Sequence, residues 1–281
     1  MIQEVIKELV GRANVVDLII CVGGVLVLAV WLLKTSLGTK ALINSPHRRN
    51  DMPSYLALIP LFFWFLTTWL LSLVKEKAFT DLSGWQDAFA ENLVMCLAAA
   101  PVVVTGLVIA RIHFARRLNG FGLNPKTIVR DFGAALLNLL AIMPVVLSAV
   151  ILVTLAGKIF VGPEYQMPRH EELNEILAYP QWQVRALIIV SAIVVVPFVE
   201  EVLFRGVFQT LLRSYLGMPW PAIILASLIF IIFHANPEHW PALFMLSLCL
   251  GYAYEKSGSL FRSIFIHSLF NAMSVFAALG Q

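Results

Sequence analysis

Long apolar runs separated by short polar segments cover most of the chain. Eight of these runs approach the length of about 17–25 residues that crosses a bilayer as a helix. They are residues 15–33, 55–74, 93–110, 132–156, 186–215, 219–235, 240–254 and 260–279. The runs lack the strict apolar–polar alternation of membrane β-strands, and a backbone in lipid must satisfy its own hydrogen bonds. We therefore predict an all-α protein, a polytopic membrane helix bundle with about eight transmembrane helices.

Composition supports a membrane environment. Of the 281 residues, 59 % are hydrophobic and 13 % are charged. An ordinary soluble domain is about 45–50 % apolar and about 25 % charged. These values exclude a disordered chain and an ordinary cytosolic enzyme. The net charge of +3 is typical of membrane proteins and gives no indication of nucleic acid as a partner. We expect a multi-pass integral membrane protein with lipid as a partner, in a bacterial cell (inner) membrane.

The distribution of Lys and Arg predicts an orientation. The loops after the first, third, fifth and seventh runs, with Arg262 at their border, hold twelve of these residues, and the other side holds seven. The positive-inside rule then places the richer loops in the cytoplasm and both termini outside it. Arg262 is expected to reach the headgroups. We divide the chain into residues 1–183, with transmembrane helices one to four, and residues 184–281, a C-terminal core with helices five to eight.

Three segments of the last third carry ionisable or amide side chains inside apolar runs. They read FVEEVLFR at 198–205, FIIFH at 230–234 and HSLFN at 267–271. A charged residue at this depth costs about 2.5–3.5 kcal/mol on insertion scales. Glu201 and Arg205 are spaced i, i+4 and can form a pair on one helix face. Glu200 is left without a built-in partner, which makes it the candidate general base.

The spacing of the polar residues predicts that they meet. A tight turn is expected at Gly217–Met218, with Glu201 16 residues before Gly217 and His234 16 residues after Met218. In an antiparallel hairpin these two side chains lie at the same depth. His267 and Asn271 are again i, i+4 and share one face of the last run. Pro197 removes a backbone hydrogen bond just before the carboxylates and could introduce a kink.

Each part of this pattern has a structural explanation when it stands alone. A Glu–Arg pair in a membrane is often structural or part of an ion pathway, a buried His is often a packing residue, and an Asn often links helices. Together and in order, the patterns EE-x3-R, F-x3-H and H-x3-N resemble the signature of the CPBP family. This family comprises CAAX proteases and bacteriocin-processing enzymes, which are intramembrane glutamic endopeptidases. The resemblance covers roughly residues 186–276.

The resemblance implies a role for each polar residue of the three segments. Glu200, the first of the EE pair, would act as the general base that activates a water molecule. His234 would hold and polarise that water. His267 and Asn271 would donate hydrogen bonds to the oxyanion of the tetrahedral intermediate.

The remaining catalytic candidates are Glu201 and Arg205, which would form an ion pair that fixes the site. No cofactor is expected, although two histidines and a glutamate could hold zinc with an open fourth position. The function implied is hydrolysis of a peptide bond in a membrane-associated protein or peptide. A zinc-dependent version of this hydrolase is one alternative. A non-enzymatic transporter or immunity protein that uses the buried Glu/Arg/His cluster is the other. The sequence leaves the substrate open, including whether it is prenylated.

Overall fold

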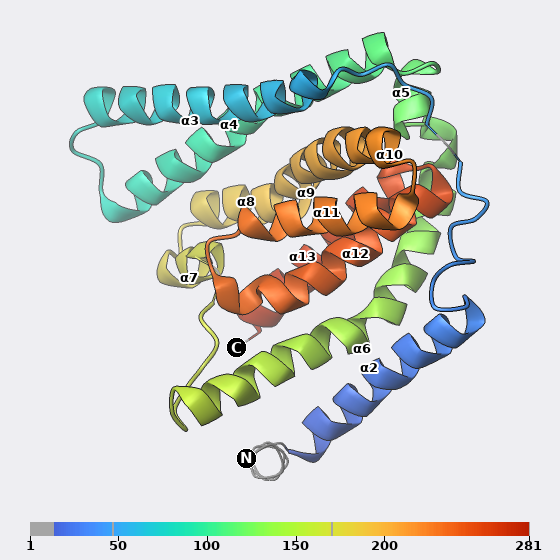
Figure 1. Cartoon of the computed structure of the whole chain (residues 1–281). Coiled ribbons are helices and arrows are strands. Elements are labelled where there is room, and N and C mark those ends of the chain that lie inside the picture. The colour runs from blue at the N-terminus through green and yellow to red at the C-terminus, as the bar shows by residue number, and fades with distance from the viewer. Residues whose placement is uncertain (1–13, 47, 170, 281) are drawn as a thin grey trace.

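A computed structural model describes residues 14–46, 48–169 and 171–280, and within these ranges every regular element is a helix (Figure 1). The all-α prediction is thereby confirmed. In chain order the elements are α2 (Val15–Lys34), η1 (Ser54–Ala57), α3 (Leu58–Ala78), α4 (Gly84–His113), α5 (Arg117–Phe121), η2 (Pro125–Thr127), α6 (Ile128–Phe160), α7 (Glu171–Ala178), α8 (Trp182–Val190), η3 (Ser191–Val195), α9 (Val196–Glu200), η4 (Glu201–Gln209), α10 (Thr210–Leu216), α11 (Pro219–Ile232), η5 (Pro237–His239), α12 (Trp240–Ser257) and α13 (Leu260–Leu279).

All eight predicted runs fall on helices, but six of the described helices have the length and hydropathy of a membrane span. The six are Val15–Lys34, Ser54–Ala78, Gly84–His113, Pro125–Phe160, Trp182–Leu216 and Leu260–Leu279. The remaining two runs correspond to α11 and α12. Helix α11 has 14 residues and is about 21 Å long, whereas the hydrocarbon core is about 30 Å thick. The predicted count of eight spans is therefore not confirmed.

Local sequence explains where several helices begin and end. Asn14 and Asp17 form a reciprocal capping box at the start of α2, and Ser83 and Gln86 do the same for α4. Pro219 stands at the first position of α11, where its missing N–H is not needed. Helix α12 ends at Gly258, which adopts a left-handed conformation with φ of 71° that suits glycine.

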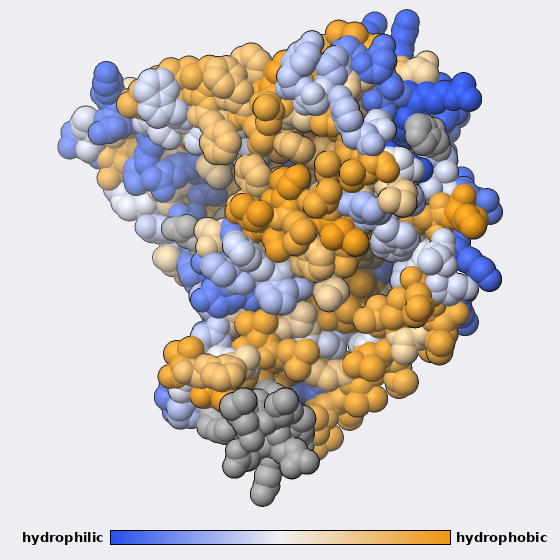
Figure 2. Space-filling model, viewed as in Figure 1, coloured by the Kyte–Doolittle hydropathy of each residue, from blue (hydrophilic) through white to orange (hydrophobic). Residues whose placement is uncertain are grey.

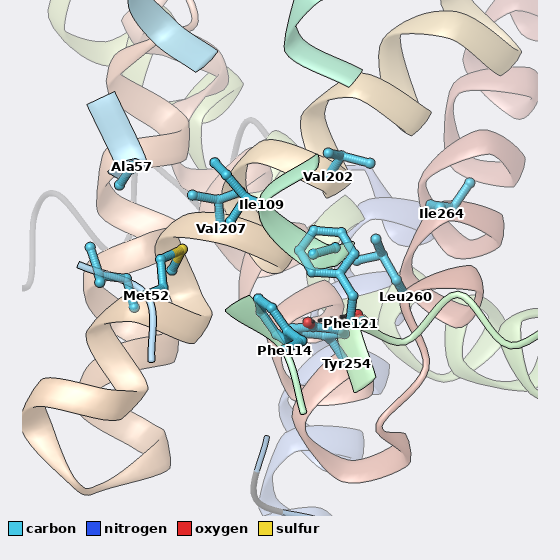
Figure 3. Packing of buried hydrophobic residues seen from close by; sticks show 12 residues of the cluster. Met52, Ala57, Ile109, Phe114, Phe121, Val202, Val207, Tyr254, Leu260 and Ile264 are labelled. Carbon is cyan, nitrogen blue, oxygen red and sulfur yellow. Dashed lines mark hydrogen bonds between the residues drawn. The ribbon is translucent and has the colours of Figure 1, made fainter. Parts of the chain in front are cut away.

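The loops that follow α2, α4, α10 and α12 gather at one end of the bundle (Figure 1). There, Asn50 bonds Ser214, and the amide of Leu260 bonds the carbonyl of Gly122. Below these loops lies an apolar cluster in which Phe114 and Phe121 approach Tyr254 and Leu260 (Figure 3). We call this the arginine-rich end, because the loops there hold most of the arginines counted as cytoplasmic.

Large apolar side chains are exposed along α2, α3, α4 and α6. Figure 2 shows such residues across the middle of one face, with hydrophilic residues at its margins. This distribution is that of a multi-pass membrane protein whose solvent is lipid. The guanidinium of Arg262, expected from the sequence to reach the headgroups, bonds the buried carboxylate of Asp131, with 2.9 Å between Nη2 and Oδ1.

The helix that carries both glutamates, Trp182–Leu216, contains two π-helical stretches, η3 and η4. In η3 the N–H of Val196 bonds the carbonyl of Ser191, five residues back. Such i→i+5 segments are rare and frequently lie at functional sites. Neighbours pack closely on η4: a Cβ on Gly106 would lie 2.5 Å from a methyl carbon of Val202, so only glycine allows α4 to approach this near.

Candidate active site

Glu201 and Arg205 form a fully buried ion pair in η4. The Arg205 Nη1 atom lies 2.8 Å from the Glu201 Oε1 atom, and both side chains are at most 2 % exposed. The predicted pairing is therefore present, although it is set in a π-helix. A buried ion pair is stabilising only when additional hydrogen bonds satisfy both groups. Further partners of this pair come from α12 and α13, while Glu201 Oε2 accepts no hydrogen bond from the described residues.

His267, on α13, bonds the same carboxylate oxygen. Its Nδ1 lies 3.0 Å from Glu201 Oε1, and the side chain is 5 % exposed. Because Arg205 also donates to this oxygen, Glu201 acts as the acceptor and His267 as the donor. The arrangement fixes the orientation of the imidazole, as a buried carboxylate does for the histidine of a catalytic triad. The second ring nitrogen, Nε2, remains available to take part in a reaction.

Glu200 faces that second nitrogen. Its Oε2 lies 3.7 Å from His267 Nε2, and its side chain is 13 % exposed, compared with 0 % for Glu201. Oε2 is buried and accepts no hydrogen bond from the described residues. A separation of 3.7 Å is too long for a direct hydrogen bond and suits a bridging water. Of the two carboxylates, Glu200 is the one without a built-in partner, as the spacing predicted.

His234 lies just beyond the end of α11. The predicted run 219–235 had placed it within the helix. Its Nδ1 is 2.9 Å from the carbonyl oxygen of Phe230. A carbonyl can only accept, so Nδ1 carries the hydrogen, and Nε2 of the neutral ring presents a lone pair. The ring of Phe230 contacts both histidines, with centroid distances of 4.6 Å to His234 and 6.0 Å to His267. Phe230 thus links the two rings.

Asn271 lies one turn beyond His267 on α13, but its amide points to the backbone of η3. The Asn271 Nδ2 atom donates to the carbonyl oxygen of Ala192 at 2.8 Å. Among the described residues, Asn271 makes no hydrogen bond to another of the predicted site residues. A side-chain amide has two N–H groups, so one donor remains for another acceptor.

Three further residues support the site, and of these the sequence pattern F-x3-H had marked only Phe230, without a role. Ser247 on α12 accepts from Arg205 through its Oγ, 2.7 Å from Nη2. Phe230 lies beneath the same guanidinium, with its centroid 4.7 Å from the Cζ of Arg205. Trp240 donates its indole N–H to the carbonyl of His234 at 2.9 Å. Ser247 and Trp240 have no local spacing signal, because Ser247 is 42 residues from Arg205 and Trp240 looks like an ordinary packing residue.

The geometry of these side chains also bears on metal binding. Within residues 14–46, 48–169 and 171–280, no group of three or more His, Cys, Asp or Glu residues is arranged to hold a metal ion. Glu201 and His267 already bond each other, and His234 uses Nδ1 on a backbone carbonyl. The side chains of the group are two carboxylates, two imidazoles, a guanidinium and an amide, which can supply a base and hydrogen-bond donors.

Comparison with known proteins found one family that is similar to the part of the chain that carries this site. Residues 181–273 match the family model described as type II CAAX prenyl endopeptidase, Rce1-like. Neither the curated proteins nor the solved structures gave a match to the chain. The matched region contains all six residues predicted to form the site. Residues 181–273, which carry the site, are therefore similar to the CPBP/CAAX protease family, whose members are hydrolases that act on peptide bonds.

Proposed function

We propose that the protein is an intramembrane endopeptidase in which Glu200 activates a water molecule for attack on a peptide bond. The observation that carries this proposal is the position of Glu200 Oε2, buried, unpaired and 3.7 Å from His267 Nε2. Glu201 is less suited to act as the base, because its Oε1 binds both Arg205 and His267 and its side chain is fully buried. A water between Glu200 and His267 would satisfy both groups.

The proposed reaction gives each polar group of the site a role. Glu200 takes a proton from the water as the water oxygen attacks the carbonyl carbon, and His234 orients the water through the lone pair of Nε2. His267, in its protonated form, and the second N–H of Asn271 donate to the oxyanion. The proton on Glu200 then passes to the leaving nitrogen as the C–N bond breaks. Arg205 touches no reacting atom and acts by positioning Glu201.

The catalytic core proposed here is the C-terminal part of the chain, residues 184–281, with residues 1–183 as a membrane scaffold. In support, the partners of the Glu201, Arg205, His267 and Asn271 side chains and of the His234 ring lie in η3, η4, α11, α12 or α13. We further propose a bacterial cell membrane as the location. The substrate would be a membrane-associated protein or peptide, because Glu201 and its partners lie deep among apolar helices and a soluble chain has no favourable path to them.

The experiment compares peptide termini in membranes from cells that produce the wild-type chain or the Glu200→Ala variant. New termini that depend on the wild-type chain define substrates, and the purified protein in liposomes should then cleave those peptides. We expect the variant to lose at least about 10²-fold in rate, which is the usual contribution of a general base. Its helical content and thermal unfolding midpoint should remain close to wild type.

A matched control is Glu164→Ala, which removes an exposed glutamate from the loop after α6. This variant should cleave at the wild-type rate. Undiminished cleavage by the folded Glu200→Ala variant would show that another group is the base. Absence of any terminus that depends on the wild-type chain, across membrane and secreted proteins, would remove the protease proposal itself.

A further inference from the structure

A separate cavity of about 310 Å³ lies at the arginine-rich end. None of its lining residues belongs to the candidate active site. It is formed by the loop after α2, the segment between α4 and α5, and the turn between α12 and α13. We call it the arginine cavity. The residues that give it its character are Arg48, Arg49, Arg116, Asn119, Gly120 and Gly258.

The charge around the arginine cavity is positive. Of the described residues that line it, three are arginines and none is acidic. The carboxylate of Glu255 bonds Arg48 through Oε2 and Arg213 through Oε1, each at 3.0 Å. Two guanidiniums therefore share one carboxylate, and the exposed Arg49 adds further positive charge. Such a site attracts an anion with several oxygen atoms.

Arg48 is a built part of this cavity and not a mobile surface residue. Its side chain is 6 % exposed, and its Cζ stacks 3.6 Å from the centroid of Tyr254. Tyr254 is held in turn by its bond to the carbonyl of Phe121. The Nε of Arg48 is buried and has no acceptor among the described residues. An unmade bond at a buried donor is costly, and an anionic oxygen is the acceptor that would complete it.

We propose that the arginine cavity binds the phosphate group of an anionic lipid headgroup. A free phosphate ion has the same oxygen chemistry, but the setting favours the lipid. Large apolar side chains cover the helices that lead to this end, so acyl chains have a surface to lie against. The positive-inside rule also assigns these loops to the cytoplasmic leaflet, where anionic lipids attract basic residues. This proposal is independent of the proposed protease chemistry.

The test measures lipid binding to the purified, delipidated full-length chain by native mass spectrometry. The probes are phosphatidylglycerol, zwitterionic phosphatidylcholine and inorganic phosphate. We expect one phosphatidylglycerol to bind at least about tenfold more tightly than phosphatidylcholine, and millimolar phosphate not to displace it. The double variant Arg49→Ala/Arg116→Ala should weaken this binding about tenfold, because each arginine supplies charge-assisted hydrogen bonds. Arg48 is left intact, since its loss would strand the buried Glu255.

The matched control removes the same charge elsewhere at this end. Arg111 and Lys126 are exposed and do not line the cavity. The Arg111→Ala/Lys126→Ala variant should bind phosphatidylglycerol like the wild type, and both double variants should unfold at the wild-type temperature. Equal weakening by the two double variants would indicate a diffuse charge effect and overturn the site. Equal binding of the two lipids would also overturn it. Displacement of the lipid by millimolar phosphate would overturn the assignment to a lipid.

Discussion

The side-chain amide of Asn271 donates to the backbone carbonyl of Ala192, with 2.8 Å between nitrogen and oxygen. This bond fills a gap in the helix. The N–H of Val196, which would bond Ala192 in an α-helix, bonds Ser191 instead. The π-helical donor would be residue 197, five positions on, but Pro197 has no N–H. Asn271 therefore supplies the donor that the proline lacks.

This relationship predicts that Asn271→Ala lowers the stability of the fold as well as the reaction rate. An unmet buried carbonyl costs about 1–3 kcal/mol, which should appear as a lower midpoint of thermal unfolding. In a Pro197→Ala background, residue 197 gains an N–H that can bond Ala192. The stability loss caused by Asn271→Ala should then shrink by about 1 kcal/mol, measured as a double-mutant cycle.

The activity of the same cycle separates the two roles of Asn271. If it also donates to the oxyanion, the double variant Asn271→Ala/Pro197→Ala regains stability but stays at least about 10²-fold slower than Pro197→Ala alone. If Asn271→Ala costs the same stability in the wild-type and Pro197→Ala backgrounds, Asn271 does not replace the missing N–H of Pro197. Recovery of the full rate together with stability would limit Asn271 to a structural role.

Ser247 is expected to act on catalysis through Arg205. Its Oγ accepts from the guanidinium at 2.7 Å, and both residues are at most 1 % exposed. Ser247→Ala should cost about 1–3 kcal/mol in stability. Arg205→Ala should cost about 3–5 kcal/mol, because it leaves the Glu201 charge buried without its partner.

Kinetics on the folded fraction provide the readout that distinguishes positioning from structure alone. If Ser247 positions Arg205, and through it Glu201 and His267, Ser247→Ala lowers kcat and leaves KM near the wild-type value. Ser247→Thr keeps the hydroxyl and should restore most of kcat. A stability loss with unchanged kcat per folded molecule would mean that Ser247 only supports packing.

Hydrophobic run length predicted the helices of this fold well, because lipid imposes a simple requirement on the backbone. The same reasoning could not place the ends of short helices. His234 lies beyond α11, which ends at Ile232 even though the apolar residues continue. The π-helical bonding of η4 also leaves no mark in apolar periodicity, since it changes which carbonyl each N–H meets and not which residues are apolar.

The sequence likewise predicted only some of the contacts in the candidate site. The pair Glu201–Arg205 was predicted because i, i+4 spacing is a local signal, and the structure confirms that they bond. The contact between His267 and Glu201 joins residues 66 positions apart, so the packing of α13 against η4 decides it. The partner of Asn271 is a backbone carbonyl, and backbone acceptors carry no sequence signature.

The metal-free form of the proposed reaction predicts that chelators leave activity unchanged. The expected outcome is that the purified enzyme, treated with EDTA and with 1,10-phenanthroline and then dialysed, cleaves its substrate at the untreated rate. Metal analysis should also find no zinc in proportion to enzyme. Activity that falls with chelator and returns with added zinc would instead assign the histidines and a glutamate to a zinc site.

Direct attack by water makes a labelling prediction about Glu200. In a single turnover with enzyme in excess in H₂¹⁸O, the new carboxyl terminus of the product should carry one ¹⁸O atom. If Glu200 instead attacked the peptide carbonyl, hydrolysis of the resulting anhydride at the glutamyl carbon would leave ¹⁸O in Glu200 and unlabelled oxygen in the product. Mass spectrometry of the product and of the peptide that contains Glu200 distinguishes the two routes. Label in Glu200 would contradict its role as a general base, whereas label confined to the product is the result expected from the unpaired position of its Oε2 beside His267.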